Sequence, residues 1–125
     1  MFQKLTPILR VEAIEPQLDF WVNRLGFTNV VEAKVGEELG FAILKMGHIE
    51  VMLQSRASLA KDIPVLAKGD FSATVLYLGI TDLEEIEKKL QGLEVIVPKR
   101  QTEYGTMEIW VRTPGGHVVG FAAAS

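Results

Sequence analysis

The chain has 125 residues, 48% of them hydrophobic and 23% charged, with a formal net charge of -3 and no cysteine. This composition indicates one globular domain over residues 1–125 that buries its own core, and it excludes disulfides and thiolate chemistry. The basic residues form no patch for nucleic acid, and no segment reaches the roughly 20 apolar residues that span a bilayer. Since no signal-peptide pattern begins the chain, we expect a cytoplasmic protein without a membrane or nucleic-acid partner.

The first half of the chain predicts the order βαβββ. A strand is expected over Leu5–Val11, followed by a helix over Glu15–Leu25 that ends before Gly26. The apolar stripe of this helix comprises Ile14, Leu18, Trp21, Val22 and Leu25, and it assigns Trp21 to the core. Three strands follow over Thr28–Val35, Gly40–Met46 and Ile49–Gln54, with a tight turn at Gly47.

The second half repeats this order after a linker over residues 56–70, which has a helix-like turn. Module 1 therefore covers about 1–55 and module 2 about 71–125. A strand at residues 73–80 precedes a short helix, for which Thr81 and Glu84 form a capping box. The last three strands are expected over Glu94–Arg100, Met107–Thr113 and His117–Ala123. The fold class is α+β, with a ferredoxin-like arrangement as the rival.

Three stretches go beyond this general pattern: LTPILRVEAIEPQLDFWVNRLGF, GFAILKMGHIEVMLQ and YGTMEIWVRTPGGHVVGF. In this order on a double βαβββ frame they resemble the vicinal oxygen chelate superfamily, the glyoxalase, bleomycin resistance protein and extradiol dioxygenase group. The resemblance covers nearly the whole chain. It implies an open, cup-like barrel made by two modules, a homodimer, and a small molecule bound in the cup.

Strand alternation predicts which side chains line that cup. Residues that alternate with the helix-facing positions lie on the other face of each sheet. The predicted ligand-binding residues on this shared concave surface are Arg10, Glu50, Met52, Tyr77, Glu108, Trp110 and Arg112. Glu50 interrupts the apolar run GHIEVML, and a carboxylate there has to face water, have a partner or bind a ligand.

The superfamily's metal-ligand places fall on Thr6, Glu50, Val75 and Gly120, so Glu50 is the one residue that matches. A catalytic divalent ion needs about three protein ligands, which the sequence does not supply at these places. The two histidines, His48 and His117, are predicted in or beside hairpin turns. We therefore predict no metal site and no other cofactor.

The resemblance and the missing ligand set favour a metal-independent binding protein of the bleomycin resistance type, without catalysis. It would sequester an amphipathic or cationic ligand, with Trp110 and Tyr77 stacking on flat parts and Glu50, Glu108, Arg10 and Arg112 holding polar groups. One alternative is a glyoxalase-like lyase, a thiol transferase or another enzyme of the superfamily with an atypical metal site. Another is a structural or regulatory dimer whose cup is filled by its own side chains. The identity of the ligand and the chains that form each site stay open.

Overall fold

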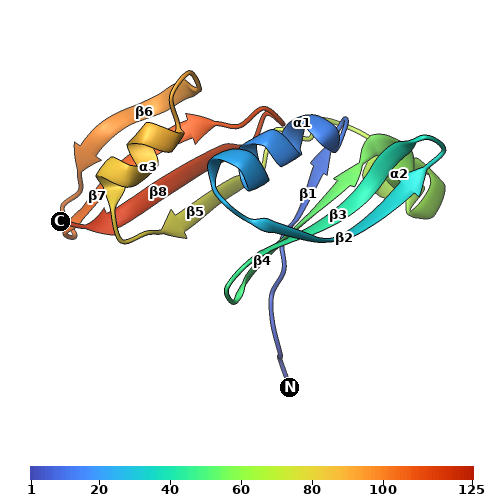
Figure 1. Cartoon of the computed structure of the whole chain (residues 1–125), viewed down its shortest axis with the longest axis horizontal. Helices are drawn as coiled ribbons and strands as arrows, with labels where there is room; N and C mark the ends of the chain where they lie inside the picture. Colours follow the sequence, from blue (N-terminus) through green and yellow to red (C-terminus); the bar gives the residue numbers. More distant parts are fainter. The chain divides into compact units, whose positions relative to one another are not determined.

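The computed structural model describes residues 1–125 and contains two compact units, Met1–Phe71 and Ser72–Ser125 (Figure 1). Each unit has a four-stranded sheet, and neither sheet closes into a barrel. A strand, a helix and three further strands follow one another in each unit, so the predicted α+β class with two βαβββ modules is confirmed. None of the helices is both long and apolar enough to cross a bilayer.

The first unit contains the sheet β1-β4-β3-β2, in which only the β1–β4 pair is parallel. Its elements are β1 (Ile8–Val11), α1 (Glu15–Leu18), η1 (Asp19–Arg24), β2 (Thr28–Val35), β3 (Glu38–Met46) and β4 (Ile49–Ser55). The first strand begins three residues later than predicted, because Pro7 has no N–H to donate to the sheet. Leu5, assigned to that strand from sequence, is 89% exposed in an extended arm.

The first helix has a wider turn than its sequence pattern indicated. α1 continues into the π-helical η1, where the Leu25 N–H donates to the Phe20 carbonyl at 3.1 Å. Phe20 and Trp21 are both buried as a result, and their rings and that of Phe27 pack edge to face at 5.2 Å. The core position of Trp21 is as predicted. Phe20 was missed because a spacing of 3.6 residues per turn does not describe this segment.

The second unit repeats the strand order of the first as β5-β8-β7-β6, again with one parallel pair, β5–β8. Its elements are β5 (Val75–Gly79), α3 (Leu83–Lys89), β6 (Glu94–Gln101), β7 (Thr106–Arg112) and β8 (Val118–Ala124). Helix α3 lies across one face of this sheet and contacts β8 (Figure 1). The internal repeat inferred from the sequence is therefore present as a repeated topology.

The predicted start of α3 was wrong by one residue. Asp82, and not Thr81, is the N-cap, and its carboxylate accepts a hydrogen bond from the Glu85 N–H at 3.1 Å. Aspartate is as good an N-cap as serine or threonine, and its charge also interacts favourably with the helix dipole. Beyond the end of the helix, Gly92 adopts a φ of 85°, which a glycine accommodates without strain.

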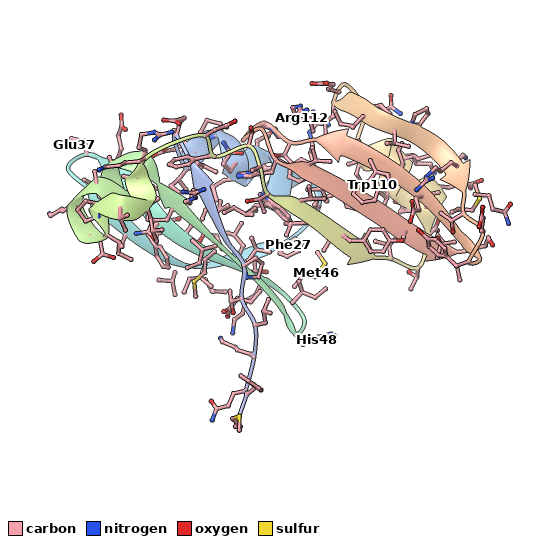
Figure 2. The ribbon with its side chains drawn as sticks, turned by 180° about the vertical axis from the view of Figure 1, so that it is seen from behind. Phe27, Glu37, Met46, His48, Trp110 and Arg112 are labelled. Carbon is pink, nitrogen blue, oxygen red and sulfur yellow. The ribbon has the colours of Figure 1, made fainter.

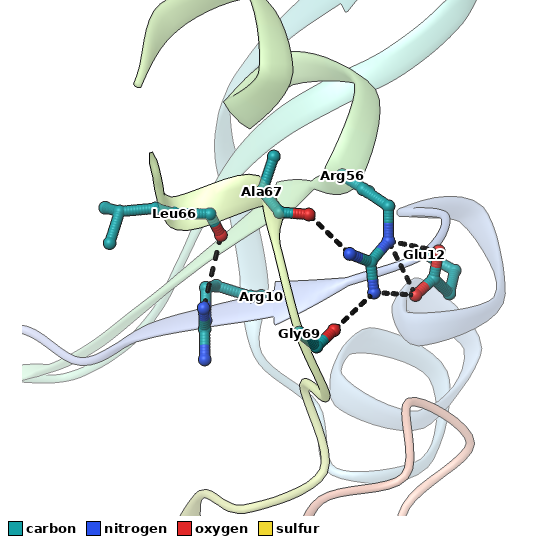
Figure 3. Close-up of polar contacts among 6 residues, drawn as sticks. All are labelled: Arg10, Glu12, Arg56, Leu66, Ala67 and Gly69. Atoms are coloured by element: carbon teal, nitrogen blue, oxygen red, sulfur yellow. Dashed lines mark hydrogen bonds and ion pairs between the residues drawn. The ribbon is translucent and has the colours of Figure 1, made fainter. Parts of the chain in front are cut away.

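The segment after β4 is ordered by two helical pieces, α2 (Arg56–Asp62) and η2 (Pro64–Ala67). The Arg56 guanidinium donates to Glu12 at 2.6 Å, to the Gly69 carbonyl at 3.0 Å and to the Ala67 carbonyl (Figure 3). It also lies 3.8 Å from the centre of the Phe71 ring, a favourable cation–π arrangement. Arg56 holds the pKa of Glu12 below its usual value, chiefly through their hydrogen bond. Within the first unit, the Arg56 side chain thus links Glu12, just after β1, to the end of η2 and the segment that follows it.

Strand alternation can be tested at two neighbouring positions of β1. Leu9 is fully buried, whereas Ile8 is 50% exposed. We expect Leu9→Ala to lower the free energy of unfolding by about 2–5 kcal/mol, because truncation of a buried side chain leaves a cavity. Ile8→Ala is the matched control, with an expected loss below about 1 kcal/mol. Chemical denaturation measures both, and equal losses would contradict the assignment of the two faces.

Candidate functional site: an aromatic face held by a buried carboxylate

Three of the predicted ligand-binding residues meet within the second unit. Tyr77 on β5 and Glu108 and Trp110 on β7 lie on one face of the sheet, opposite the face that buries Val111. Figure 2 shows Trp110 on the sheet and Arg112 further along the same strand. Because side chains alternate along β7, Glu108 and Trp110 lie on the same face of the sheet. Tyr77 and Trp110 are both paired with Gly120 of β8, from the two strands that flank it.

Glu108 has no exposed surface and accepts three hydrogen bonds. The Tyr77 hydroxyl donates to one carboxylate oxygen, while the Arg100 guanidinium at 3.0 Å and the Trp110 indole N–H at 3.1 Å donate to the other. The hydrogen bond from Tyr77, followed by those from Trp110 and Arg100, holds the pKa of Glu108 below its usual value. The carboxylate therefore stabilises the fold above the ordinary pKa of 4.5, and this contribution is lost as the pH falls through the lowered pKa.

The Trp110 ring lies directly on the backbone of β8. A Cβ atom added at Gly120 would be 2.7–2.8 Å from three carbons of the indole, a distance that real contacts do not reach. The Tyr77 ring lies 5.6 Å from the Trp110 ring at an angle of 41°, and Tyr77 is 51% exposed. Gly120 thus allows the indole to sit flat on the sheet, and the aromatic pair presents a partly exposed face.

In the first unit, Glu50 has partners. Its carboxylate accepts hydrogen bonds from the Lys4 ammonium at 2.9 Å and the Thr6 hydroxyl at 3.0 Å, and the Lys45 ammonium lies 3.4 Å away. The Lys4 bond, and then the Thr6 bond, keep the pKa of Glu50 below its usual value. Met52, two residues along β4, is half-buried. The charge that interrupts GHIEVML is therefore an ion-paired carboxylate.

The two predicted arginines are held by backbone carbonyls of their own units. Arg10 donates to the Leu66 carbonyl at 3.2 Å (Figure 3). Its guanidinium lies 4.7 Å from the centre of the Phe71 ring. Arg112 donates to the Gly116 carbonyl at 2.9 Å and lies 3.4 Å from the Glu94 carboxylate. That all seven residues share one concave surface stays a prediction.

The residues at the superfamily's metal-ligand places do not fit a catalytic metal. The Thr6 hydroxyl donates to Glu50, Val75 is aliphatic, and Gly120 has no side chain and lies under Trp110. Neither unit by itself gathers three or more histidine, aspartate or glutamate side chains around one point. A divalent ion at Glu50 would have to displace two lysines and would find one carboxylate.

The histidines lie beside the hairpin turns, as predicted. His48 is exposed in the turn between β3 and β4 (Figure 2), whereas His117 is buried at the turn between β7 and β8. The Thr113 N–H donates to the His117 carbonyl at 2.8 Å, which closes the β7–β8 turn.

Sequence reasoning missed Arg100 and the two lysines that pair with Glu50. Arg100 stands opposite Glu108 in the β6–β7 register, and Lys45 stands opposite Glu50 in the β3–β4 register. Oppositely charged residues at directly paired positions attract each other across a sheet. Counting back from the predicted Gly47 turn would have paired Lys45 with Glu50.

The close contact between Gly120 and Trp110 predicts that adding even a methyl group at Gly120 disturbs the packing of the indole. We expect Gly120→Ala to displace the indole, shift the Trp110 emission to longer wavelength and lower the free energy of unfolding by about 1–3 kcal/mol. Gly79→Ala is the control on the same sheet, because a Cβ atom there meets nothing within 4 Å. Equal behaviour of the two variants in fluorescence and denaturation would contradict the packing described here.

The hydrogen bond from Tyr77 to Glu108 can be tested by titration. In Tyr77→Phe, the pKa of Glu108 should rise toward 4.5, because the largest cause of its lowering is removed. Tyr104→Phe serves as control, since Tyr104 is 73% exposed and its hydroxyl does not donate to Glu108. The carboxyl carbon shift of Glu108, followed by NMR against pH, measures both; an unchanged pKa in Tyr77→Phe would rule out this bond as the cause.

Comparison with known proteins gives relatives by structure alone: no family model and no curated protein matches the sequence. A glyoxalase/bleomycin resistance protein/dioxygenase family enzyme from Burkholderia phytofirmans superposes with a TM-score of 0.78 at 12% identity, covering 96% of this chain and 97% of that one. The bleomycin-binding protein from Streptomyces verticillus, complexed with copper(II)-bleomycin, gives 0.64 at 21% identity, covering 100% and 98%.

A lactoylglutathione lyase from Agrobacterium tumefaciens gives a TM-score of 0.74 at 14% identity, covering 97% of this chain and 92% of that one. Identities of this size show a shared fold and leave the activity open. The rival ferredoxin-like arrangement is not supported by any of these three structures. The resemblance found in the sequence is thus confirmed at the level of architecture, and the chain has the fold of the glyoxalase, bleomycin resistance protein and dioxygenase group.

Proposed function

We propose that this protein binds a small amphipathic molecule and does so without a metal and without transforming it. The observation that carries the proposal is the pair of rings formed by Tyr77 and Trp110, which Glu108 and Gly120 fix on the sheet of the second unit. A flat part of the ligand would stack on the half-exposed Tyr77 and on Trp110.

Preorganisation is the physical reason that this face suits binding. Ordering a side chain at an interface costs about 0.5–1.5 kcal/mol, and rings that are already fixed avoid that cost. Both rings are held by hydrogen bonds at their edges, and one face of the indole lies on Gly120, so the opposite face of Trp110 is not needed to hold the ring. Glu108, which accepts hydrogen bonds from both rings, is itself bound by Arg100 at 3.0 Å, so its own position does not depend on a ligand.

The comparisons support this proposal at the level of the fold. The Streptomyces verticillus protein of the same fold is a bleomycin-binding protein, so the architecture accommodates a small-molecule site. A homodimer in the cytoplasm is part of our proposal, and Arg10, Glu50, Met52 and Arg112 remain proposed ligand-binding residues.

An enzymatic role is the second candidate, because a lactoylglutathione lyase shares the fold. It requires an atypical metal site with ligands from outside the four superfamily places, because Glu50 is the one residue among them that could bind a metal. Metal analysis tests the enzymatic role. Wild type and Glu50→Ala would be dialysed against nickel, zinc, manganese and ferrous iron, and the metal retained by each would be measured. Retention of about one ion per chain that depends on Glu50, together with turnover of a hemithioacetal, would replace the binding proposal.

The binding proposal predicts a saturable response that depends on Trp110. We expect calorimetric titration with a panel of planar heteroaromatic compounds and bleomycin to yield at least one saturable ligand. Trp110→Ala should weaken that ligand at least about tenfold, which corresponds to about 1.4 kcal/mol. The control is Val95→Ala, which truncates a half-exposed apolar side chain on β6 opposite the buried Val111. No saturable ligand in the panel, or equal losses in both variants, would argue against the proposal.

A further inference from the structure

We propose that the polar group of the ligand is an anion, such as a carboxylate, bound by Arg100 at the edge of the Tyr77–Trp110 pair. This inference rests on the proposed function and names the class of ligand, a planar aromatic acid. It differs from the amphipathic or cationic ligand expected from sequence, and the difference arises from the partners of the two carboxylates.

Neither predicted carboxylate is available to a cationic ligand. Glu108 is fully buried, and three protein donors already bind its two oxygens. Glu50 binds Lys4, Thr6 and Lys45, so its side chain, 10% exposed, lies between two ammonium groups. A ligand cation would have to displace protein cations at Glu50 or reach a group without exposed surface at Glu108.

Unlike these two carboxylates, Arg100 is exposed and has hydrogen-bond donors that no protein group uses. Its side chain is 52% exposed, and of the five N–H donors of a guanidinium, one at Nη2 binds Glu108 at 3.0 Å. The remaining donors are available to a ligand, and the guanidinium keeps its charge at any physiological pH. The bond to Glu108 also limits the orientations of the guanidinium, so less entropy is lost when a second carboxylate binds it.

Glu108 places the Arg100 guanidinium next to the aromatic face. Arg100 and the Trp110 indole N–H donate to the same oxygen of Glu108, so the guanidinium and the edge of the indole are neighbours. A planar ligand that stacks on Trp110 can therefore direct an acidic substituent toward Arg100. A positively charged substituent at the same place would meet the guanidinium and be repelled.

Three ligands of one shape and different charge test this inference. Calorimetry on the full chain would compare 9-anthracenecarboxylate, 9-anthracenemethanol and 9-anthracenylmethylammonium. We expect wild type to bind the carboxylate about tenfold more tightly than the alcohol, and the ammonium least tightly. Arg100→Gln should abolish this preference while changing the affinity for the alcohol by less than about twofold. Arg100→Lys should retain part of the preference, because it keeps the charge and loses the planar fork.

Lys99→Gln is the matched control, because it removes the same charge one residue away. Lys99 pairs with Glu87 of α3 at 3.0 Å, on the helix-covered side of the sheet. This variant should bind all three compounds as wild type does. The Trp110 indole N–H resonance and the unfolding midpoint would show that Arg100→Gln retains the fold and the aromatic pair.

The outcomes separate this inference from the proposed function. Equal affinity of wild type for the three compounds, or an equal loss for all three in Arg100→Gln, overturns the anion preference and leaves aromatic binding in place. Preference for the ammonium compound overturns it as well. If none of the three binds, the inference fails, and the panel with bleomycin then decides the proposed function independently.

Discussion

The buried carboxylate of Glu108 is the constraint on which the aromatic face of the second unit depends. An ionised group without exposed surface is stable only when its oxygens are fully hydrogen-bonded, and here tyrosine, tryptophan and arginine side chains supply the donors. Each donor is thereby held in one orientation. The requirement to satisfy one charge determines where two aromatic rings and one cation stand.

The two units have the same strand order, and each has a glutamate on its sheet whose charge is paired by different side chains. Glu50 remains slightly exposed and is paired with lysines from the N-terminal arm and from β3, whereas Glu108 is enclosed by its partners. Exposed lysines are mobile and strongly hydrated, so the Glu50 cluster orders little else. The Glu108 cluster contains rigid rings, and it creates a defined surface.

This difference bears on the kind of chemistry that the chain supports. Catalysis by a divalent ion needs several ligand side chains directed at one point, and the positions predicted from the sequence resemblance hold a threonine, a paired glutamate, a valine and a glycine. Binding of a flat molecule needs fixed apolar faces and one or two polar groups, which Tyr77, Trp110 and Arg100 provide. The fold is common to binding proteins and enzymes, so the side chains of this chain, and not its topology, favour binding.

The sequence by itself determined the order of elements, the repeat and the faces of the strands, because alternation and the turn residues are local properties. The ideal helical period failed in one place, where the π-helical turn brought Phe20 into the core. At α3, two neighbouring residues could both cap the helix, and the N-cap is Asp82. Pro7 likewise delayed the first strand, a shift that its missing N–H explains.

Only the tertiary structure decided the burial of Glu108 and its pairing with Arg100, whereas the predicted turn at Gly47 already implied the pair Lys45–Glu50. The pairing of Arg100 with Glu108 depends on where the β6–β7 turn ends. The register of the two strands also shifts between Val97 and Arg100. The contact of Trp110 with Gly120 joins two different strands at a distance that no spacing within one strand encodes. A sequence specifies which face a side chain takes, whereas its neighbours on that face follow from strand pairing, and strand pairing is a property of the folded sheet.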